Sequence, residues 1–126
     1  MRKTITVLAI SLLFPLGMFA QTNQSTSAPH DGRCEIIQLQ LAARNTFRLD
    51  RFTGNIAQLI SVAGGRMNWS YMTINGLPSI ERPTRARFQI FTSGHAVRFT
   101  FLIDTDTGNT WVMTESGNSI LWEPIR

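Results

Sequence analysis

Apolar and polar residues alternate with a period of two along most of the chain after residue 33. Ile37, Leu39 and Leu41 alternate with glutamines, and Phe101 and Ile103 alternate with Thr100 and Leu102. Alternation of this kind in β-branched and aromatic residues is typical of half-buried strands. It predicts an all-β fold of about eight antiparallel strands in a small sandwich or barrel. The expected strands are 35–41, 46–50, 55–61, 66–74, 87–92, 96–104, 109–115 and 119–123.

The chain also repeats itself with an offset of 54 residues. Residues 33–59 align with 87–113 without a gap, and ten of the 27 aligned positions are identical. We interpret this as two tandem copies of one unit, repeat 1 at 33–74 and repeat 2 at 87–125. The segment 75–86 links them.

A lone unit of about 40 residues buries too little apolar surface to fold alone. We therefore expect the repeats to share one core and to form a single β domain over 33–126. The sequence pattern suggests that the faces carrying Phe47 with Leu49 and Phe101 with Ile103 meet across an axis near two-fold.

The best-defined element that the copies share is a turn between two apolar runs, Leu-Asp-x-x-Thr-Gly-Asn in repeat 1 and Ile-Asp-x-x-Thr-Gly-Asn in repeat 2. The aspartate can accept a backbone hydrogen bond, and glycine supplies the positive φ that closes a short loop. We expect valine to damage the fold equally at either glycine, and asparagine to be a milder change than alanine at the second aspartate. The structural turn residues are Asp50, Thr53, Gly54, Asn55, Asp104, Thr107, Gly108 and Asn109.

Calcium binding is the alternative interpretation of the second turn. Asp104, Asp106 and Glu115 have the spacing of the first, third and last ligands of an EF-hand loop. The glycine of such a loop would fall on Asn109, the flanks are strands, and repeat 1 has Phe52 where repeat 2 has an aspartate. We therefore expect no metal site.

The N-terminus has the pattern of a secretory signal. Two basic residues precede an apolar run that ends at Ala20, which is shorter than a comfortable membrane span. We expect a signal peptide over 1–20, cleaved before Gln21, and a flexible lead-in over 21–32. An uncleaved membrane anchor is the alternative. Cleavage would leave no stable membrane span, and the protein would be exported to the periplasm or the medium.

Composition agrees with a folded, exported domain. Of 126 residues, 43% are hydrophobic and only 16% charged, which excludes general disorder. Without the signal, ten scattered arginines and eight acidic residues leave a net charge of about +2, so no nucleic-acid partner is expected. The lone Cys34 is either a buried small hydrophobe or a disulfide link between two copies in a homo-oligomer.

Catalytic chemistry finds little support in the sequence. His30 falls in the lead-in and His95 on a turn, and no nucleophile, zinc or phosphate-loop motif occurs. Asp50 and Asp104 could approach one another as the paired carboxylates of a glycosidase do. Two separate turn residues are the simpler interpretation, so we expect no catalytic residues, no cofactor and no enzyme activity.

Three tryptophans are the candidate binding surface: Trp69, Trp111 and Trp122 could line a glycan-binding face, although tryptophans at strand spacing are more often core residues. Trp111 is the most interesting, because repeat 1 has Ala57 there. The run from Phe101 to Trp111, followed by Trp122, resembles small exported bacterial proteins of uncharacterised function that carry a strand–Asp-Thr-x-Thr-Gly–strand hairpin. The resemblance implies a bacterial exported protein and no particular activity.

The function that these features favour is a non-enzymatic binding module for a protein or glycan partner in the bacterial envelope. An inhibitor or immunity protein against an envelope-acting enzyme is a more specific alternative, since a rigid sheet presents pre-organised loops. A small carboxylate-based hydrolase is a third hypothesis. The fourth is self-association, in which each four-strand unit is one blade of a propeller that several chains complete.

Overall fold

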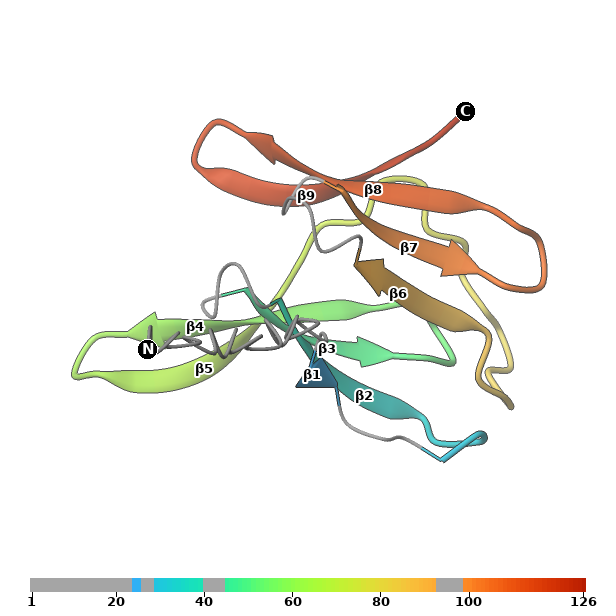
Figure 1. The fold of residues 1–126 in the computed structure, drawn as a ribbon, viewed down its shortest axis with the longest axis horizontal. Helices are drawn as coiled ribbons and strands as arrows, with labels where there is room; N and C mark the ends of the chain where they lie inside the picture. The colour runs from blue at the N-terminus through green and yellow to red at the C-terminus, as the bar shows by residue number, and fades with distance from the viewer. Residues whose placement is uncertain (1–23, 26–28, 40–44, 93–98) are drawn as a thin grey trace, which may run out of the picture.

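The computed structural model describes residues 24–25, 29–39, 45–92 and 99–126, and shows an all-β protein of two antiparallel sheets (Figure 1). One sheet has the order β1-β2-β3-β4-β5 and the other the order β6-β7-β8-β9. The strands are β1 Gln24–Ser25, β2 Cys34–Gln38, β3 Thr46–Asp50, β4 Ile56–Val62, β5 Arg66–Tyr71, β6 Phe88–Thr92, β7 Thr100–Asp104, β8 Thr110–Ser116 and β9 Ser119–Pro124. The predicted fold class is confirmed. The predicted signal peptide and parts of the expected strands 35–41 and 96–104 lie outside the described residues.

The two sheets are built from equivalent strands. Adding 54 to the residue numbers of β2, β3 and β4 gives the bounds of β6, β7 and β8. The strand pairing agrees, since Cys34 lies opposite Asp50 and Phe88 opposite Asp104. The last strand is shifted by one residue, as Leu59 pairs with Trp69 whereas Met113 pairs with Trp122. The tandem repeat is therefore a repeat of structure, and each unit is a four-stranded meander.

Each unit has two faces, which we name by residues. The front face carries Phe47 in repeat 1 and Phe101 in repeat 2, and the back face carries Arg48 and Leu102. Side chains alternate along a strand and cross-strand partners share a side, so the strand pairing assigns the remaining residues. The front faces include Ile37, Leu49 and Ile56 in repeat 1, and Phe91, Ile103 and Val112 in repeat 2. The back faces include Ile36, Ala57, Met67, Trp69 and Tyr71 in repeat 1, and Phe88, Ile90, Trp111, Met113, Ile120 and Trp122 in repeat 2.

The core lies between the front face of repeat 1 and the back face of repeat 2. The rings of Phe47 and Trp122 meet edge to face with their centroids 6.1 Å apart. The other residues of this buried cluster come from the same two faces and from Leu39: Ile37, Leu49, Ile56, Phe88, Leu102, Trp111 and Met113. The two repeats therefore stack head to tail, with unlike faces in contact.

Our expectation that Phe101 and Ile103 would meet Phe47 and Leu49 in the core is wrong. Both residues of repeat 2 lie on its front face, which points away from the core, and both are only partly buried. Leu102 takes the inward position instead and is fully buried. A two-fold axis would bring the same face of both repeats together, so the axis expected from the sequence is also wrong.

A connecting segment ties the two sheets at their edge. After β5 the chain crosses from the first sheet to the second, where Ile74 forms an isolated parallel bridge with Trp122. The Trp122 N–H donates to the Thr73 carbonyl at 3.0 Å, and the Asn75 N–H donates to the Trp122 carbonyl at 2.9 Å. Residues 73–75 therefore occupy the outer edge of β9 before the chain returns to β6.

Candidate functional site

The repeated turns each hold an arginine–aspartate pair, because the residue before the first strand of each unit reaches the aspartate that ends the second. In repeat 1, Arg33 Nε and Nη2 donate to Asp50 Oδ2 at 3.1 and 2.9 Å. In repeat 2, Arg87 Nε donates to Asp104 Oδ1 at 2.9 Å and Nη2 donates to Oδ2. Thr107 Oγ1 also donates to Asp104 Oδ2 at 2.8 Å.

These pairs fix the ionisation of both aspartates. Burial opposes the charge on Asp104, but the hydrogen bonds from Arg87 and Thr107 outweigh it and hold its pKa below the ordinary value of 3.8. For Asp50, burial is likewise outweighed by hydrogen bonds from Arg33 and the Phe52 N–H, and its pKa is lowered. A glycosidase acid needs a raised pKa. The two carboxylates thus act as hydrogen-bond acceptors within separate turns, and the hydrolase hypothesis gains no support from their geometry.

The carboxylates considered for calcium are directed to arginines. Asp106 forms ion pairs with Arg85 and Arg87, and Asp104 is paired with Arg87 as well. Glu115 lies near the opposite end of β8. Within the described residues, no group of three or more histidine, cysteine, aspartate or glutamate side chains is placed to hold a metal ion. His95 lies outside them.

The tryptophans do not form one surface. Trp111 and Trp122 are 2% and 0% exposed, because both lie on the back face of repeat 2 against repeat 1. The indole N–H of Trp111 donates to the Asn75 carbonyl at 2.8 Å, which satisfies its polar group inside the core. Only Trp69 lies on an outer face, where the guanidinium of Arg48 lies 5.1 Å from its ring centre. The prediction of a three-tryptophan surface is therefore wrong for Trp111 and Trp122.

Cys34 is exposed, so its interpretation as a buried hydrophobe is wrong. It occupies the back face of repeat 1, at the position where repeat 2 has the fully buried Phe88. A disulfide between two copies remains a prediction.

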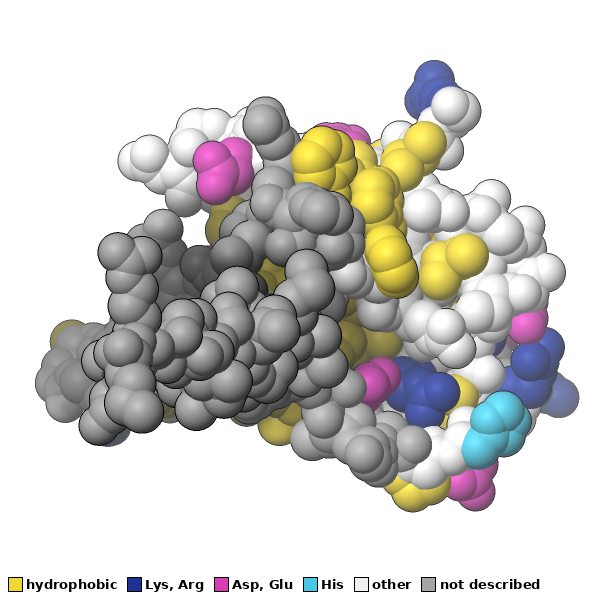
Figure 2. Space-filling view, in the orientation of Figure 1, with side chains coloured by type: hydrophobic (Ala, Val, Ile, Leu, Met, Phe, Trp, Pro, Cys, Tyr) yellow, Lys and Arg dark blue, Asp and Glu magenta, His cyan; other side chains and the backbone are white. Residues whose placement is uncertain are grey.

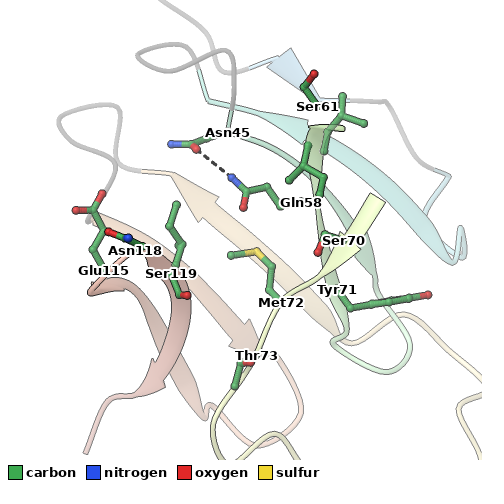
Figure 3. A pocket seen from close by; sticks show the side chains of 13 residues that line it. Asn45, Gln58, Ser61, Ser70, Tyr71, Met72, Thr73, Glu115, Asn118 and Ser119 are labelled. Carbon is green, nitrogen blue, oxygen red and sulfur yellow. Dashed lines mark hydrogen bonds between the residues drawn. The ribbon is translucent and has the colours of Figure 1, made fainter. Parts of the chain in front are cut away.

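A cleft opens between the two sheets at the end where the β4–β5 and β8–β9 hairpins turn (Figure 3). Its volume is about 630 Å³, within the usual range for a small-molecule site. Gln58 of β4 donates to Asn45 Oδ1 at 3.3 Å across the wall of the cleft. Met72 points from the end of β5 toward the opposing sheet, whereas Tyr71 points away from it. The lining residues with polar side chains are Asn45, Gln58, Ser61, Ser70, Thr73, Glu115, Asn118 and Ser119. The pairing of Ser61 with Met67 and of Ser119 with Ser116 places these two serine side chains on the outer faces of the sheets.

The chemistry of this cleft is mostly that of neutral hydrogen-bonding groups beside apolar surface. Amides and hydroxyls offer both donors and acceptors, and Ile60, Met72 and Ile120 supply apolar contact. The cleft was not among the sites predicted from the sequence. A signal was present at Gln58, which interrupts the inward series Ile56, Gln58, Ile60 of β4 with a polar residue.

Comparisons with protein-family models, with curated proteins and with solved structures find no match. Across the described residues, no helix has the length and apolar character needed to cross a membrane.

Proposed function

We propose that the protein is an exported, non-enzymatic binding module that takes a glycan of the bacterial envelope into the inter-sheet cleft. The cleft is the observation that carries the proposal. A glycan ring presents hydroxyls around its rim and C–H groups on its faces, and the lining offers amide and hydroxyl partners next to Met72 and Ile120. Export is supported by the basic and apolar pattern of residues 1–20.

The walls of the cleft are pre-organised, which favours binding because little side-chain freedom is then lost. Asn45 is 5% exposed and is fixed by its hydrogen bond from Gln58. On the opposite wall, Asn118 belongs to the tight β8–β9 turn, and Ile120 lies in β9 directly after it. A protein partner would need a protruding loop to reach these groups, so we place a glycan chain first.

Calorimetric titration with soluble peptidoglycan fragments and neutral oligosaccharides tests the proposal. Ser70 pairs with Gln58 and shares its inward face, so Ser70→Trp places a large side chain in the cleft and should abolish binding. Ser79→Trp, exposed in the linker, should leave binding unchanged. Both variants should keep the wild-type melting temperature within a few degrees.

Three results would contradict the proposal. They are the absence of heat with every fragment, binding that Ser70→Trp leaves intact, and release of cleaved products. The last would reinstate a hydrolase, and stable capture of an envelope enzyme with loss of its activity would favour the inhibitor alternative.

A further inference from the structure

The head-to-tail stacking leaves one face of each repeat without its counterpart. The front face of repeat 1 is covered by the back face of repeat 2, so the back face of repeat 1 and the front face of repeat 2 point outward. Exposed large apolar side chains gather on these two faces, with Ile36, Met67 and Tyr71 on the first and Phe91 on the second. Figure 2 shows apolar side chains gathered over the second sheet.

Ile125 adds to the outward face of repeat 2. Its N–H donates to the Thr110 carbonyl, as the Met72 N–H donates to the Ile56 carbonyl in repeat 1. Met72 packs against the core and accepts a hydrogen bond from the indole of Trp122. Ile125, half exposed, thus occupies the position in repeat 2 that is packed in repeat 1.

We infer that copies of this chain assemble head to tail, with the front face of repeat 2 in one copy packed on the back face of repeat 1 in the next. The contact between the two repeats of one chain is the model for the contact between copies. Phe101 is the residue of repeat 2 that is equivalent to Phe47, and Trp69 of the next copy is equivalent to Trp122. The edge-to-face ring contact that joins the two repeats would then recur between Phe101 and that Trp69.

The turns fit the same arrangement. The Arg51 carbonyl in the turn of repeat 1 accepts hydrogen bonds from the Arg87 and Phe88 N–H groups of repeat 2 at 2.8 and 2.9 Å. The equivalent carbonyl in repeat 2 belongs to Thr105, and the equivalent donors are Arg33 and Cys34 of the next copy.

The glycines of the two turns differ in whether a neighbouring strand packs against them. A Cβ atom on Gly54 would lie 2.9 Å from Phe88, whereas one on Gly108 would meet nothing within 4 Å. Cys34 aligns with Phe88 and is exposed. In the inferred assembly, Cys34 of the next copy would lie in the space beside Gly108. The second turn thus has the shape of the first but lacks its covering strand.

A second copy is a better occupant than an unrelated protein, because the chain already demonstrates that these two kinds of face fit. Among the described residues of every chain, one front face and one back face are uncovered, so each copy can bind one neighbour on either side. Such unlike-face contacts close into a ring where the rotation permits and otherwise continue as a filament. About two to four copies would give four to eight sheets, the usual size of a propeller.

Two charged variants at exposed positions test the inference without touching the core. Phe91→Glu places a charge on the front face of repeat 2, and Met67→Glu places one on the back face of repeat 1. The native side chains of Phe91 and Met67 are 61% and 59% exposed. Ala63→Glu in the β4–β5 turn is the matched control, because it adds the same charge outside both faces. Light scattering coupled to gel filtration gives the mass of each, and circular dichroism checks the fold.

We expect the wild type and Ala63→Glu to assemble and each face variant to be a folded monomer. A mixture of Phe91→Glu and Met67→Glu should yield a one-to-one dimer and nothing larger, because only one good pair of faces remains. In addition, Cys34 should react with a thiol reagent much faster in the Phe91→Glu monomer than in the assembled wild type. A monomeric wild type throughout a dilution series would overturn the inference. So would a face variant that still assembles, or a Cys34 that reacts equally fast in both.

Discussion

Replacing the aspartate of each turn tests whether burial makes the two copies of one motif energetically different. Asp104 is fully buried and its partner Arg87 is 18% exposed, whereas Asp50 and Arg33 are 21% and 56% exposed. Removing one partner of a buried pair costs about 3–5 kcal/mol. Because Asp106 stays 3.5 Å from Arg87 Nε, we expect Asp104→Ala to cost about 3 kcal/mol.

The matched change Asp50→Ala should cost much less. Its exposed ion pair contributes little, so the main loss is the hydrogen bonds that Asp50 Oδ1 accepts from the Phe52 and Thr53 N–H groups at 3.0 and 3.3 Å. We expect about 1 kcal/mol for that loss. Denaturant melts of both variants in the Phe91→Glu background measure the difference without a contribution from assembly. Equal costs at the two positions would refute the reasoning.

Asparagine at residue 104 sharpens the test and revises what the sequence suggested. Both oxygens of Asp104 accept from Arg87, so an amide NH₂ at either place would face a donor. Asp104→Asn should therefore destabilise nearly as much as alanine.

The cost at residue 104 should depend on pH with a defined sign. The pKa of Asp104 is lower in the folded chain than the ordinary 3.8. The unfolded chain consequently takes up the proton first as the solution is acidified, and stability falls. The difference in unfolding free energy between wild type and Asp104→Ala should be constant above pH 5 or so and shrink below about pH 4. A difference that grew on acidification would contradict this.

Two further outcomes are expected. Gly54→Ala should destabilise more than Gly108→Ala in denaturant melts, which revises the equal damage expected from the sequence. Both glycines have positive φ, at 81° and 77°, but only at Gly54 would the new Cβ press on Leu77 and Phe88. Equal losses would contradict the packing described for the first turn. Protein recovered from the periplasm or medium should give an intact mass that begins at Gln21, and a mass that includes residues 1–20 would contradict cleavage.

The strand positions could be predicted from the sequence because alternation and turn chemistry are local properties. The strands expected at 46–50 and 66–74 are found at Thr46–Asp50 and Arg66–Tyr71. The choice of face is not local, because β7 is apolar on both sides, with Phe101, Leu102 and Ile103 in succession. The equivalence of Phe101 with Phe47 therefore led to the wrong prediction that the side of β7 with Phe101 faces the core.

A comparison of the repeats could have corrected the choice of face. The back-face positions occupied by Cys34, Arg48 and Ala57 in repeat 1 are occupied by phenylalanine, leucine and tryptophan in repeat 2. The larger apolar side chains of repeat 2 favour burial of its back face within the chain. The cleft could not be predicted, because Gln58 of β4 and Ile120 of β9 come to line one cavity only through the stacking of the sheets.

The crossing segment has a consequence for how this protein avoids unwanted association. An open sheet edge offers backbone groups to any extended chain and is a common start of aggregation. At β9 the N–H and carbonyl of Trp122 are already bonded to Thr73 and Asn75. Pro124, at the end of the same strand, has no N–H to donate. Strand addition around Trp122 is therefore blocked from within the chain, which restricts contacts at this part of the edge to side-chain packing, where shape can discriminate between partners.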